Sequence, residues 1–289
     1  MTEVLYEEVK SNSVLLDAAT ACRAIGVSRK WYSAWASRTP KQTGAALLNE
    51  IQEIAKAPRY GYRRVTAELN KNRGFHVNHK KVLQIMRLEG LTCKKRVFKP
   101  RTTNSNHAFK KYPNLSKEFQ ENGLNQVWVG DITYVWVADK FAYLATILDR
   151  YSRKCLGWAL GRTLEASVAL RALKKAFALR NGQSLDGLIH HTDRGVQYAC
   201  DEYVACLSRR GIQVSMTENG DPRENAFAES FNKTVKYEEA YLSEYDSFEE
   251  AEVNIGKFMK WYNKKRLHSS IGYQSPDEFE KECLRNAAS

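Results

Sequence analysis

The chain has 289 residues, of which 43% are hydrophobic, and its formal net charge is +12. It has enough apolar residues for a buried core, but no run approaches the roughly 18 consecutive apolar residues of a membrane-spanning helix. An acidic N-terminus without an apolar signal core argues against secretion, and six cysteines without a Cys-x-x-Cys pair argue against a zinc finger, so we expect a cytoplasmic protein with reduced thiols.

The positive charge is concentrated in the first part of the chain. Residues 1–120 hold 23 Lys and Arg against 9 Asp and Glu, whereas residues 121–289 hold 22 against 24. This asymmetry is typical of a polyanion-binding module joined to a different domain. A basic surface that serves only solubility is the alternative.

Residues 1–44 are predicted to contain a first helix-turn-helix. Residues 15–25 have the apolar spacing of a helix that ends at a glycine, and a serine can cap a second helix over about 29–36. Arg29 and Lys30 stand at the start of that second helix, where a recognition helix meets DNA. We therefore predict that both bind DNA, although a plain helical hairpin remains the alternative.

Residues 45–92 are predicted to form a second helical DNA-binding unit of three helices. The first spans about 45–57, the second ends near Asn72, and the third spans 78–88 with an asparagine as its cap. Arg63 and Arg64 precede the apolar part of the second helix, and we predict that they bind DNA. A small bundle that packs against the first unit would explain the same pattern.

Residues 93–123 are predicted to be a basic linker. Lys94, Lys95 and Arg96 lie in a strongly basic run, and the polar residues after it have no apolar periodicity. Such a segment can follow DNA phosphates, so these three residues are predicted DNA contacts. A flexible tether without a partner is the alternative.

Residues 124–282 are predicted to fold as an α/β RNase H-like catalytic core, with residues 283–289 as a C-terminal tail. Three strands rich in β-branched and aromatic residues come first, followed by a helix, a strand, a helix, a short strand and a helix. That order is typical of the RNase H-like fold, a mixed five-stranded sheet with helices, and two more helices would pack outside it. The predicted strands span 127–137, 141–149, 154–160, 188–192 and 212–216, and the predicted helices span 164–180, 196–209, 222–241, 249–262 and 276–284.

Three carboxylates occupy informative places in this core. Asp131 interrupts a strand that is apolar on both faces, and a carboxylate there needs a cation or hydrogen bonds to offset its desolvation. Asp193 follows the fourth strand, at the carboxyl end where α/β sheets bind ligands. Glu229 lies on the helix predicted over 222–241, away from its apolar stripe, a placement that also suits an ordinary solvated residue.

Together these carboxylates favour a site for Mg²⁺, and Mn²⁺ is expected to support activity as well. Acidic oxygen donors suit these ions better than zinc, and two ions about 4 Å apart can promote phosphoryl transfer. We therefore predict that Asp131, Asp193 and Glu229 are catalytic residues and metal ligands, with two ions per active site. Lys236 lies two turns after Glu229 on the same helix face, and we predict that it binds DNA beside the metals.

Several short motifs then identify a family resemblance. The chain resembles the DDE transposases of bacterial insertion sequences, specifically the orfB-type product of the insertion-sequence-three family, with a retroviral-integrase-like core. Each motif is weak alone, but the set is highly specific and covers nearly the whole chain. The motifs are Tyr60–Arg64, Leu83–Leu91, Trp128–Tyr134, His191–Tyr198, Asn225–Phe231, Lys236 and Tyr262–Pro276.

The resemblance implies a metal-dependent DNA transposase. It places the family's acidic triad on Asp131, Asp193 and Glu229, and it adds Arg266 and His268 as DNA-binding residues. Such an enzyme nicks the ends of its insertion sequence and joins the freed 3′-OH to DNA, so the implied partners are terminal inverted repeats and target DNA. A homo-oligomer, at least a dimer in the synaptic complex, and a bacterial, nucleoid-associated location are also implied. An upstream-frame product or a frameshift fusion is a partner that the resemblance leaves open.

Two other functions stay open at the level of the sequence. An RNase H-like nuclease would use the same carboxylates to cut DNA without joining it. A domesticated DNA-binding regulator would have an idle core, although an intact carboxylate triad argues against that function. His190 and His191 lie close to Asp193 in the chain, and for them catalytic and structural roles are both open.

Overall fold

The computed structural model describes residues 17–36, 43–56, 60–92, 109–218 and 222–287. The chain divides into two compact units, residues 1–53 and residues 54–289. The predicted DNA contacts at Lys94, Lys95 and Arg96 lie outside the described residues.

The first unit contains a helical pair, α2 (Ala18–Ile25) and α3 (Arg29–Ala36), where the sequence predicts one. Asp17 caps α2, because its side chain accepts hydrogen bonds from the backbone N–H groups of Ala19 and Thr20 at 2.9 and 3.1 Å. A glycine in the left-handed conformation ends α2, and a serine hydroxyl caps α3 through a 3.1 Å hydrogen bond. The glycine and the serine are the boundary residues that the sequence marks, whereas the cap at Asp17 was not predicted and α2 begins later than residue 15.

Three further helices occupy the region predicted as the second helical unit. α5 and α6 pack together, and their buried side chains Val65, Leu69, Val82 and Met86 recur at helical spacing. An asparagine caps α6 by accepting a 2.8 Å hydrogen bond from the second residue of the helix. The bounds are α4 (Thr43–Lys56), α5 (Tyr62–Asn72) and α6 (His79–Leu88).

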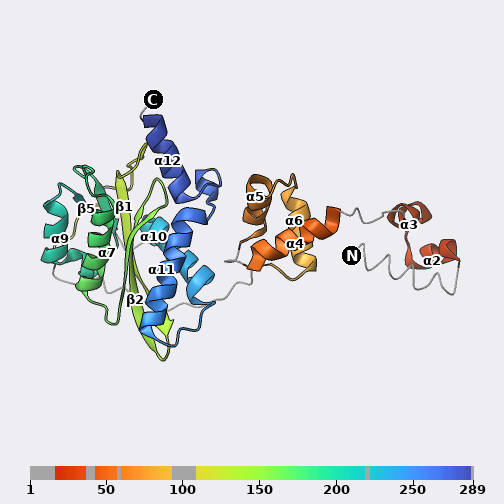
Figure 1. The fold of residues 1–289 in the computed structure, drawn as a ribbon, viewed down its shortest axis with the longest axis horizontal. Helices are drawn as coiled ribbons and strands as arrows, with labels where there is room; N and C mark the ends of the chain where they lie inside the picture. Colours follow the sequence, from red (N-terminus) through yellow and green to blue (C-terminus); the bar gives the residue numbers. More distant parts are fainter. Residues whose placement is uncertain (1–16, 37–42, 57–59, 93–108, 219–221, 288–289) are drawn as a thin grey trace. The chain divides into compact units, whose positions relative to one another are not determined.

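Five strands form one mixed sheet in the order β3-β2-β1-β4-β5, drawn in Figure 1. The pairs β1–β2 and β2–β3 are antiparallel, whereas β1–β4 and β4–β5 are parallel. This is the mixed five-stranded sheet of an RNase H-like fold, as the sequence predicts, and β1 lies at its centre. The strands are β1 (Val127–Val137), β2 (Lys140–Asp149), β3 (Cys155–Gly161), β4 (Ile189–Thr192) and β5 (Gln213–Met216).

Helices cover both faces of the sheet (Figure 1). Trp128 of β1 belongs to the core under α7 and α9, and Val129 belongs to the core under α10 and α11. Successive residues of β1 therefore supply two separate cores, one on each face. The helices of this domain are α7 (Ala166–Leu179), α8 (Val196–Ala199), α9 (Asp201–Ser208), the 3₁₀ helix η1 (Pro222–Asn225), α10 (Ala226–Val235), the π-helix η2 (Lys236–Ala240), α11 (Phe248–Lys265), the 3₁₀ helix η3 (Ser269–Ile271) and α12 (Pro276–Ala287).

Three predicted helices differ from the observed ones. Extended backbone at Cys200 divides the helix predicted over 196–209 into α8 and α9. The helix predicted over 222–241 begins as a 3₁₀ helix and ends as a π-helix. α12 continues to Ala287, so most of the segment 283–289, predicted as a tail, is helical.

Residues 109–123 pack against the core, although the sequence predicts a linker over 93–123. The backbone N–H of Leu115 donates a 2.9 Å hydrogen bond to the hydroxyl of Ser215. The Arg150 guanidinium donates to two backbone carbonyls of the same segment. These contacts join the described end of the predicted linker to the sheet.

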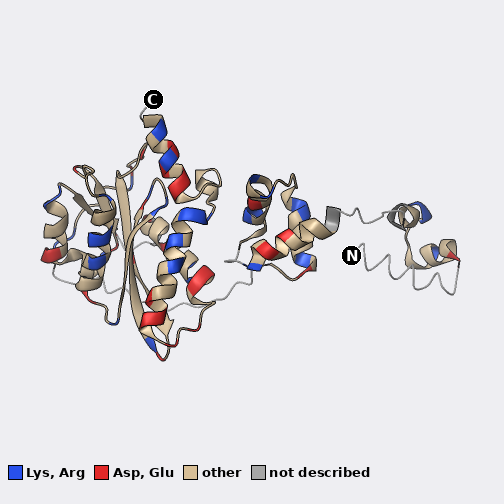
Figure 2. Cartoon of the chain, in the orientation of Figure 1, with Lys and Arg blue, Asp and Glu red and all other residues tan. Residues whose placement is uncertain are grey.

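α11 shows the charge pattern of a surface helix (Figure 2). Glu249 and Glu250 lie in its first turn and Lys264 and Lys265 in its last, which matches the direction of the helix dipole. No helix within the described ranges is both long and apolar enough to span a membrane.

Candidate active site

The candidate site lies where one edge of β1 becomes open. β4 pairs only with Val127–Val129, so beyond Gly130 no described strand pairs with β1 on that side. Asp131 is the next residue of β1, and Asp193 follows the last residue of β4. The strand register therefore brings together two carboxylates that are distant in the sequence.

Asn232 holds the Asp131 carboxylate in place. Its side-chain amide donates a 2.8 Å hydrogen bond to Oδ2 of Asp131, and the backbone N–H of Ile132 lies 2.9 Å from Oδ1. Asn232 is buried on α10, and its own oxygen lies 3.4 Å from the Thr146 hydroxyl. The sequence reasoning missed Asn232, although a polar residue one turn after Glu229 and beside buried helix positions was a usable signal.

The Asp193 carboxylate folds back over the chain that follows it. Its Oδ1 accepts a 3.0 Å hydrogen bond from the backbone N–H of Gly195. A Cβ atom on Gly195 would come within 2.9 Å of that same oxygen. Glycine is therefore needed here for the close approach of the carboxylate, since the backbone of Gly195 is not in the left-handed region.

Glu229 stands on α10 at the rim of the site. Its side chain is 32% exposed, and the Lys233 ammonium lies 3.5 Å from its Oε2, one turn further along the helix. The charge of Glu229 nevertheless acts on Asp131, as does the charge of Asp193. The three predicted catalytic carboxylates thus share one region, with Glu229 turned towards a lysine.

Desolvation and negative charge dominate the electrostatics of this region. Burial, the charge of Asp193 and, more weakly, the charge of Glu229 together raise the pKa of Asp131 to about 7. Hydrogen bonds from Asn232 and from the backbone of Ile132 oppose that rise. A cation between the carboxylates would relieve the repulsion that raises this pKa.

The donor set therefore suits a hard divalent cation at Asp131 and Asp193, because all the available donors are carboxylate oxygens. Among the described residues, no group of three or more His, Cys, Asp and Glu side chains is already arranged to hold a metal ion. Glu229 could complete such a set by a rotamer change that takes it away from Lys233. These three residues remain predicted ligands on that basis.

Lys236 is the first residue of η2 and lies close to the carboxylates. Its ammonium stands 3.8 Å from the centre of the Tyr134 ring, a cation–π contact. Burial lowers the pKa of Lys236, and the negative charge of Asp131 partly opposes this. The predicted DNA contact is thus beside the candidate site, held over an aromatic ring.

The two histidines before Asp193 have structural partners. A ring nitrogen of His190 lies 2.8 Å from the Tyr203 hydroxyl, and His191 lies 2.8 Å from the Ser215 hydroxyl and 3.1 Å from the carbonyl of Glu224. Burial lowers the pKa of His190 to about 3 and that of His191 to about 4, so both rings are neutral at neutral pH. His191 thereby links β4 to η1, which precedes α10.

The other predicted DNA contacts lie on separate elements. Arg29 and Lys30 are exposed at the start of α3, and Arg63 is exposed on α5. Arg64 is half-buried, and its Nη1 lies 3.1 Å from Oε1 of Glu238. DNA binding by these residues stays a prediction.

Arg266 is buried, unlike an arginine on the surface that could contact DNA directly. Its side chain is only 3% exposed, and its guanidinium donates to both carboxylate oxygens of Glu238 at 2.6 and 2.7 Å. His268 is half-buried and lies 3.2 Å from Nη1 of Arg266. These contacts give Arg266 a structural role, and DNA binding by this pair also stays a prediction.

Comparison with protein families gives matches in three regions of the chain. A family model described as "Integrase core domain" matches residues 121–222, and a second model with that description matches residues 210–276. A model described as "HTH-like domain" matches residues 43–99. Among solved structures, the HTLV-2 integrase catalytic core domain in complex with magnesium is similar, with a TM-score of 0.39, 16% sequence identity and coverage of 54% of this chain and 97% of that chain.

Several proteins of insertion sequences are similar over most of their length. Transposase InsF for insertion sequence IS3A of Escherichia coli (strain K12) is 32% identical over 289 residues, covering 96% of this chain and 99% of that protein. The transposase for insertion sequence element IS904 of Lactococcus lactis is 37% identical over 225 residues, covering 77% and 88%. An uncharacterized 31 kDa protein of insertion element IS600 from Shigella sonnei is 36% identical over 275 residues, covering 92% and 100%. The chain therefore belongs to the IS3 family of transposases, with an HTH-like domain followed by an integrase core domain.

Proposed function

We propose that this transposase nicks the ends of its insertion sequence and joins the freed 3′-OH to DNA by two-metal phosphoryl transfer. The observation that carries the proposal is the meeting of Asp131, Asp193 and Glu229 at the open edge of β1, where the charges of the last two act on the first. In the first step, water attacks the phosphodiester at the element end and displaces a 3′-OH. In the second step, that hydroxyl attacks another phosphodiester and displaces its 3′ oxygen.

The side chains of the site have separate roles in this scheme. Asp131, Asp193 and Glu229 are the proposed ligands of Mg²⁺, and Mn²⁺ is expected to support activity as well. Two such ions would supply the charge that activates the attacking oxygen and stabilises the leaving oxygen. Asn232 orients the Asp131 carboxylate through its 2.8 Å hydrogen bond, and Lys236 holds a DNA phosphate beside it.

The proposed partners are the terminal inverted repeats, target DNA and a second copy of this chain in the synaptic complex. Binding DNA through an HTH-like domain and cutting it in an integrase core would let one chain hold and process an element end. Two ends must be processed together for an element to move, which requires at least a dimer.

Strand-transfer assays with labelled element ends test this proposal. We expect a divalent-dependent nick at the 3′ end, followed by a joined product, and we expect Glu229→Gln to abolish both while element-end binding persists. Cleavage without any joined product would favour a nuclease. Specific binding without cleavage would favour a regulator with an idle core.

Asn232→Ala should lower the rate of nicking by roughly 10- to 100-fold, the loss typical of a residue that orients a metal ligand. The reason is that the variant removes the Asn232 amide, which among the described residues is the side chain that donates a hydrogen bond to the Asp131 carboxylate. A titration of activity against Mg²⁺ should show a higher concentration at half-maximal rate. Asn263→Ala is a control in the same domain, because Asn263 bonds the backbone of Cys155 instead. Equal Mg²⁺ curves for wild type and Asn232→Ala would rule out the orienting role.

The basic run before the core should contribute to DNA affinity by neutralising phosphates. Replacing Lys94, Lys95 and Arg96 together with alanine should reduce the slope of log K against log salt by up to about 0.9 for each phosphate that the variant no longer neutralises. Fluorescence anisotropy with a labelled element end over a range of salt concentrations measures this slope. An unchanged slope would exclude all three residues from the interface.

A further inference from the structure

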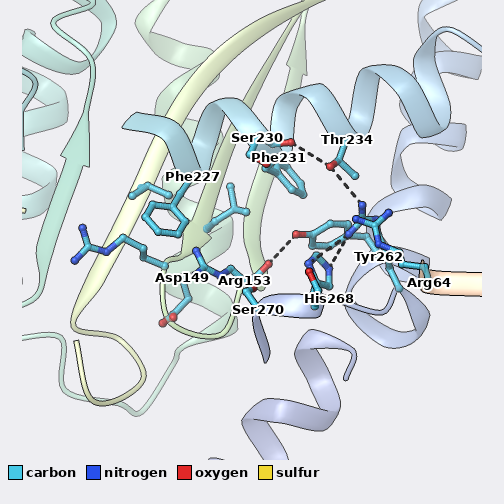
Figure 3. Close-up of a pocket in the computed structure, with 15 residues that line it drawn as sticks. Arg64, Asp149, Arg153, Phe227, Ser230, Phe231, Thr234, Tyr262, His268 and Ser270 are labelled. Carbon is cyan, nitrogen blue, oxygen red and sulfur yellow. Dashed lines mark hydrogen bonds between the residues drawn. The ribbon is translucent and has the colours of Figure 1, made fainter. Parts of the chain in front are cut away.

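A cavity of about 250 Å³ lies beside α10 (Figure 3). α10 contributes Phe227, Ser230, Phe231 and Thr234, which recur three and four residues apart and therefore share one face. Glu229 does not line the cavity. The cavity is thus separate from the carboxylate site, with α10 between them.

The cavity is lined by far more positive than negative side chains. Its one lining carboxylate, Asp149, is buried and accepts hydrogen bonds from the backbone N–H groups of Asn125, Tyr151 and Ser152 at 2.7 to 2.9 Å. These hydrogen bonds hold the Asp149 carboxylate against the neighbouring backbone. The lining arginines are Arg64, Arg150, Arg153 and Arg266.

Three of the four arginines already have carboxylate partners. Arg150 pairs with Glu121, and Arg64 and Arg266 share the single carboxylate of Glu238. Because one carboxylate serves two guanidinium groups, this part of the cavity keeps a net positive charge.

Arg153 differs from the other three. Among the described residues it has no ion pair, and its Nε is buried without any hydrogen-bond partner. Its guanidinium stands 4.1 Å from the centre of the Phe227 ring, which fixes its position at the cavity wall. A buried donor without a partner is rare in folded proteins and costs free energy unless a ligand satisfies it.

The backbone of Arg153 is also held in an unusual conformation. Its φ is +65°, in the left-handed region that residues other than glycine seldom adopt. The carbonyl of Asp149 accepts a 2.9 Å hydrogen bond from the Arg153 N–H, and the Tyr262 hydroxyl donates a 3.0 Å hydrogen bond to the Arg153 carbonyl. The fold therefore keeps this side chain directed to the cavity in the absence of any ion-pair partner among the residues that the structure describes.

The positive charge of the lining arginines also acts on His268. Burial and, in decreasing order of importance, the charges of Arg266, Arg64 and Arg153 together lower its pKa to about 2. The ring is therefore neutral at physiological pH and does not add to the charge of the cavity. Three guanidinium groups act on one half-buried ring, so an anion placed among them would be favoured.

We propose that this cavity binds one phosphate group of a DNA backbone, with Arg153 as its principal ligand and Arg64 and Ser270 at its rim. A planar guanidinium pairs with phosphate oxygens through two parallel N–H donors, and the cavity is smaller than those that hold drug-sized ligands. DNA is chosen as the source of the phosphate because the proposed function makes DNA the substrate, and to that extent this inference rests on it. DNA bound here would lie along the face of α10 that does not carry Glu229.

The test compares Arg153→Gln with Arg210→Gln. Arg210 also stacks its guanidinium on a ring, 4.0 Å from the centre of Phe177, but it is exposed and does not line the cavity, so the control variant loses the same charge outside the proposed site. Binding of an element-end duplex is measured against salt concentration in EDTA, where no catalysis takes place. We expect Arg153→Gln to lower the log–log slope by about 0.9 and Arg210→Gln to leave it unchanged. Equal slopes for both variants and wild type would overturn the proposal.

A second measurement separates DNA phosphate from free phosphate. Thermal unfolding is followed in inorganic phosphate and in chloride at equal ionic strength. Stabilisation of wild type by phosphate that is lost in Arg153→Gln, together with the slope change, supports the proposal. Phosphate stabilisation without a slope change would overturn it in favour of a small phosphorylated ligand. Because neither measurement depends on strand transfer, a failure here leaves the proposed function intact, and a failure of strand transfer leaves these results interpretable.

A second variant covers the case in which Arg153→Gln does not fold. Ser270 lines the cavity and is exposed, so Ser270→Asp places a negative charge at the rim without disturbing buried contacts. We expect it to reproduce the loss of slope and of phosphate stabilisation. Wild-type behaviour of Ser270→Asp in both measurements would count against the site.

Discussion

Asp131→Asn is expected to abolish nicking and strand transfer while leaving the metal-free protein at least as stable as the wild type. The loss of rate should be at least about 10³-fold, more than the roughly 10- to 100-fold loss of a residue that only orients a ligand. Stability should not fall, because the asparagine removes a charge that burial and the neighbouring Asp193 make unfavourable. Both properties can be measured on one preparation, by a strand-transfer assay and by thermal unfolding in EDTA.

The raised pKa of Asp131 determines whether stability rises or falls with pH. The pKa of Asp131 is about 7 in the folded protein, above the value of about 3.9 for an unfolded aspartate, so the folded state holds this proton more tightly. As pH rises from about 4 to 7, the folded state loses stability relative to the unfolded state. The melting temperature of Asp131→Asn should therefore rise relative to that of the wild type between pH 5 and pH 8. The difference should be roughly 2–4 °C for each kcal/mol of stability that the wild type loses.

A matched control and the effect of Mg²⁺ complete the test. Asp139→Asn makes the same change at an exposed position and should alter neither activity nor the pH profile. Adding Mg²⁺ at pH 8 should raise the melting temperature of the wild type more than that of Asp131→Asn. An equal loss of stability at every pH would show instead that the asparagine only disrupts packing, and the proposed electrostatic cost at Asp131 would be wrong.

Much of the core could be predicted because its signals are local in the sequence. β1 is rich in β-branched and aromatic residues and is apolar on both faces, and helices cover both of these faces in the structure. Two of the candidate carboxylates could also be predicted, because Asp131 is a charged residue within an apolar strand and Asp193 directly follows a second apolar strand. Glu229 became a candidate only as a member of that set, since its own position is half-exposed.

The break between α8 and α9 carried no such signal. Cys200 adopts an extended backbone in the middle of a segment with helical apolar spacing, without glycine or proline. The Glu280 carboxylate is a similar case, because it is buried against Arg180 and Lys154, residues 100 and 126 positions away. Such pairings depend on how the elements pack, which periodicity does not encode.

Arg266 shows the same limit for a functional residue. The motif predicts a DNA contact, and the structure places its guanidinium on the buried carboxylate of Glu238. A motif fixes which residue type occurs at a position, but burial and partners decide between a ligand contact and a structural one. The buried pair with Glu238 therefore predicts a contribution of Arg266 to stability.

Arg266→Met is expected to lower the free energy of unfolding by about 3 kcal/mol, because it leaves Glu238 buried with one arginine in place of two. For a domain of this size the melting temperature should fall by roughly 6–12 °C. Arg266→Lys should lose an intermediate amount, since it keeps the charge but cannot donate to both carboxylate oxygens at once. Thermal unfolding without DNA measures all of these changes.

The double variant Arg266→Met with Glu238→Leu identifies the cause of the loss. If the buried carboxylate is what destabilises Arg266→Met, removing it should recover at least half of the lost stability, as replacement of buried ion pairs by apolar residues often does. For Arg266→Met, the salt dependence of DNA binding, measured well below the melting temperature, should match that of the wild type. A wild-type melting temperature for Arg266→Met, combined with a slope lower by about 0.9, would make Arg266 a phosphate contact, because only a side chain that meets DNA changes the number of released counterions.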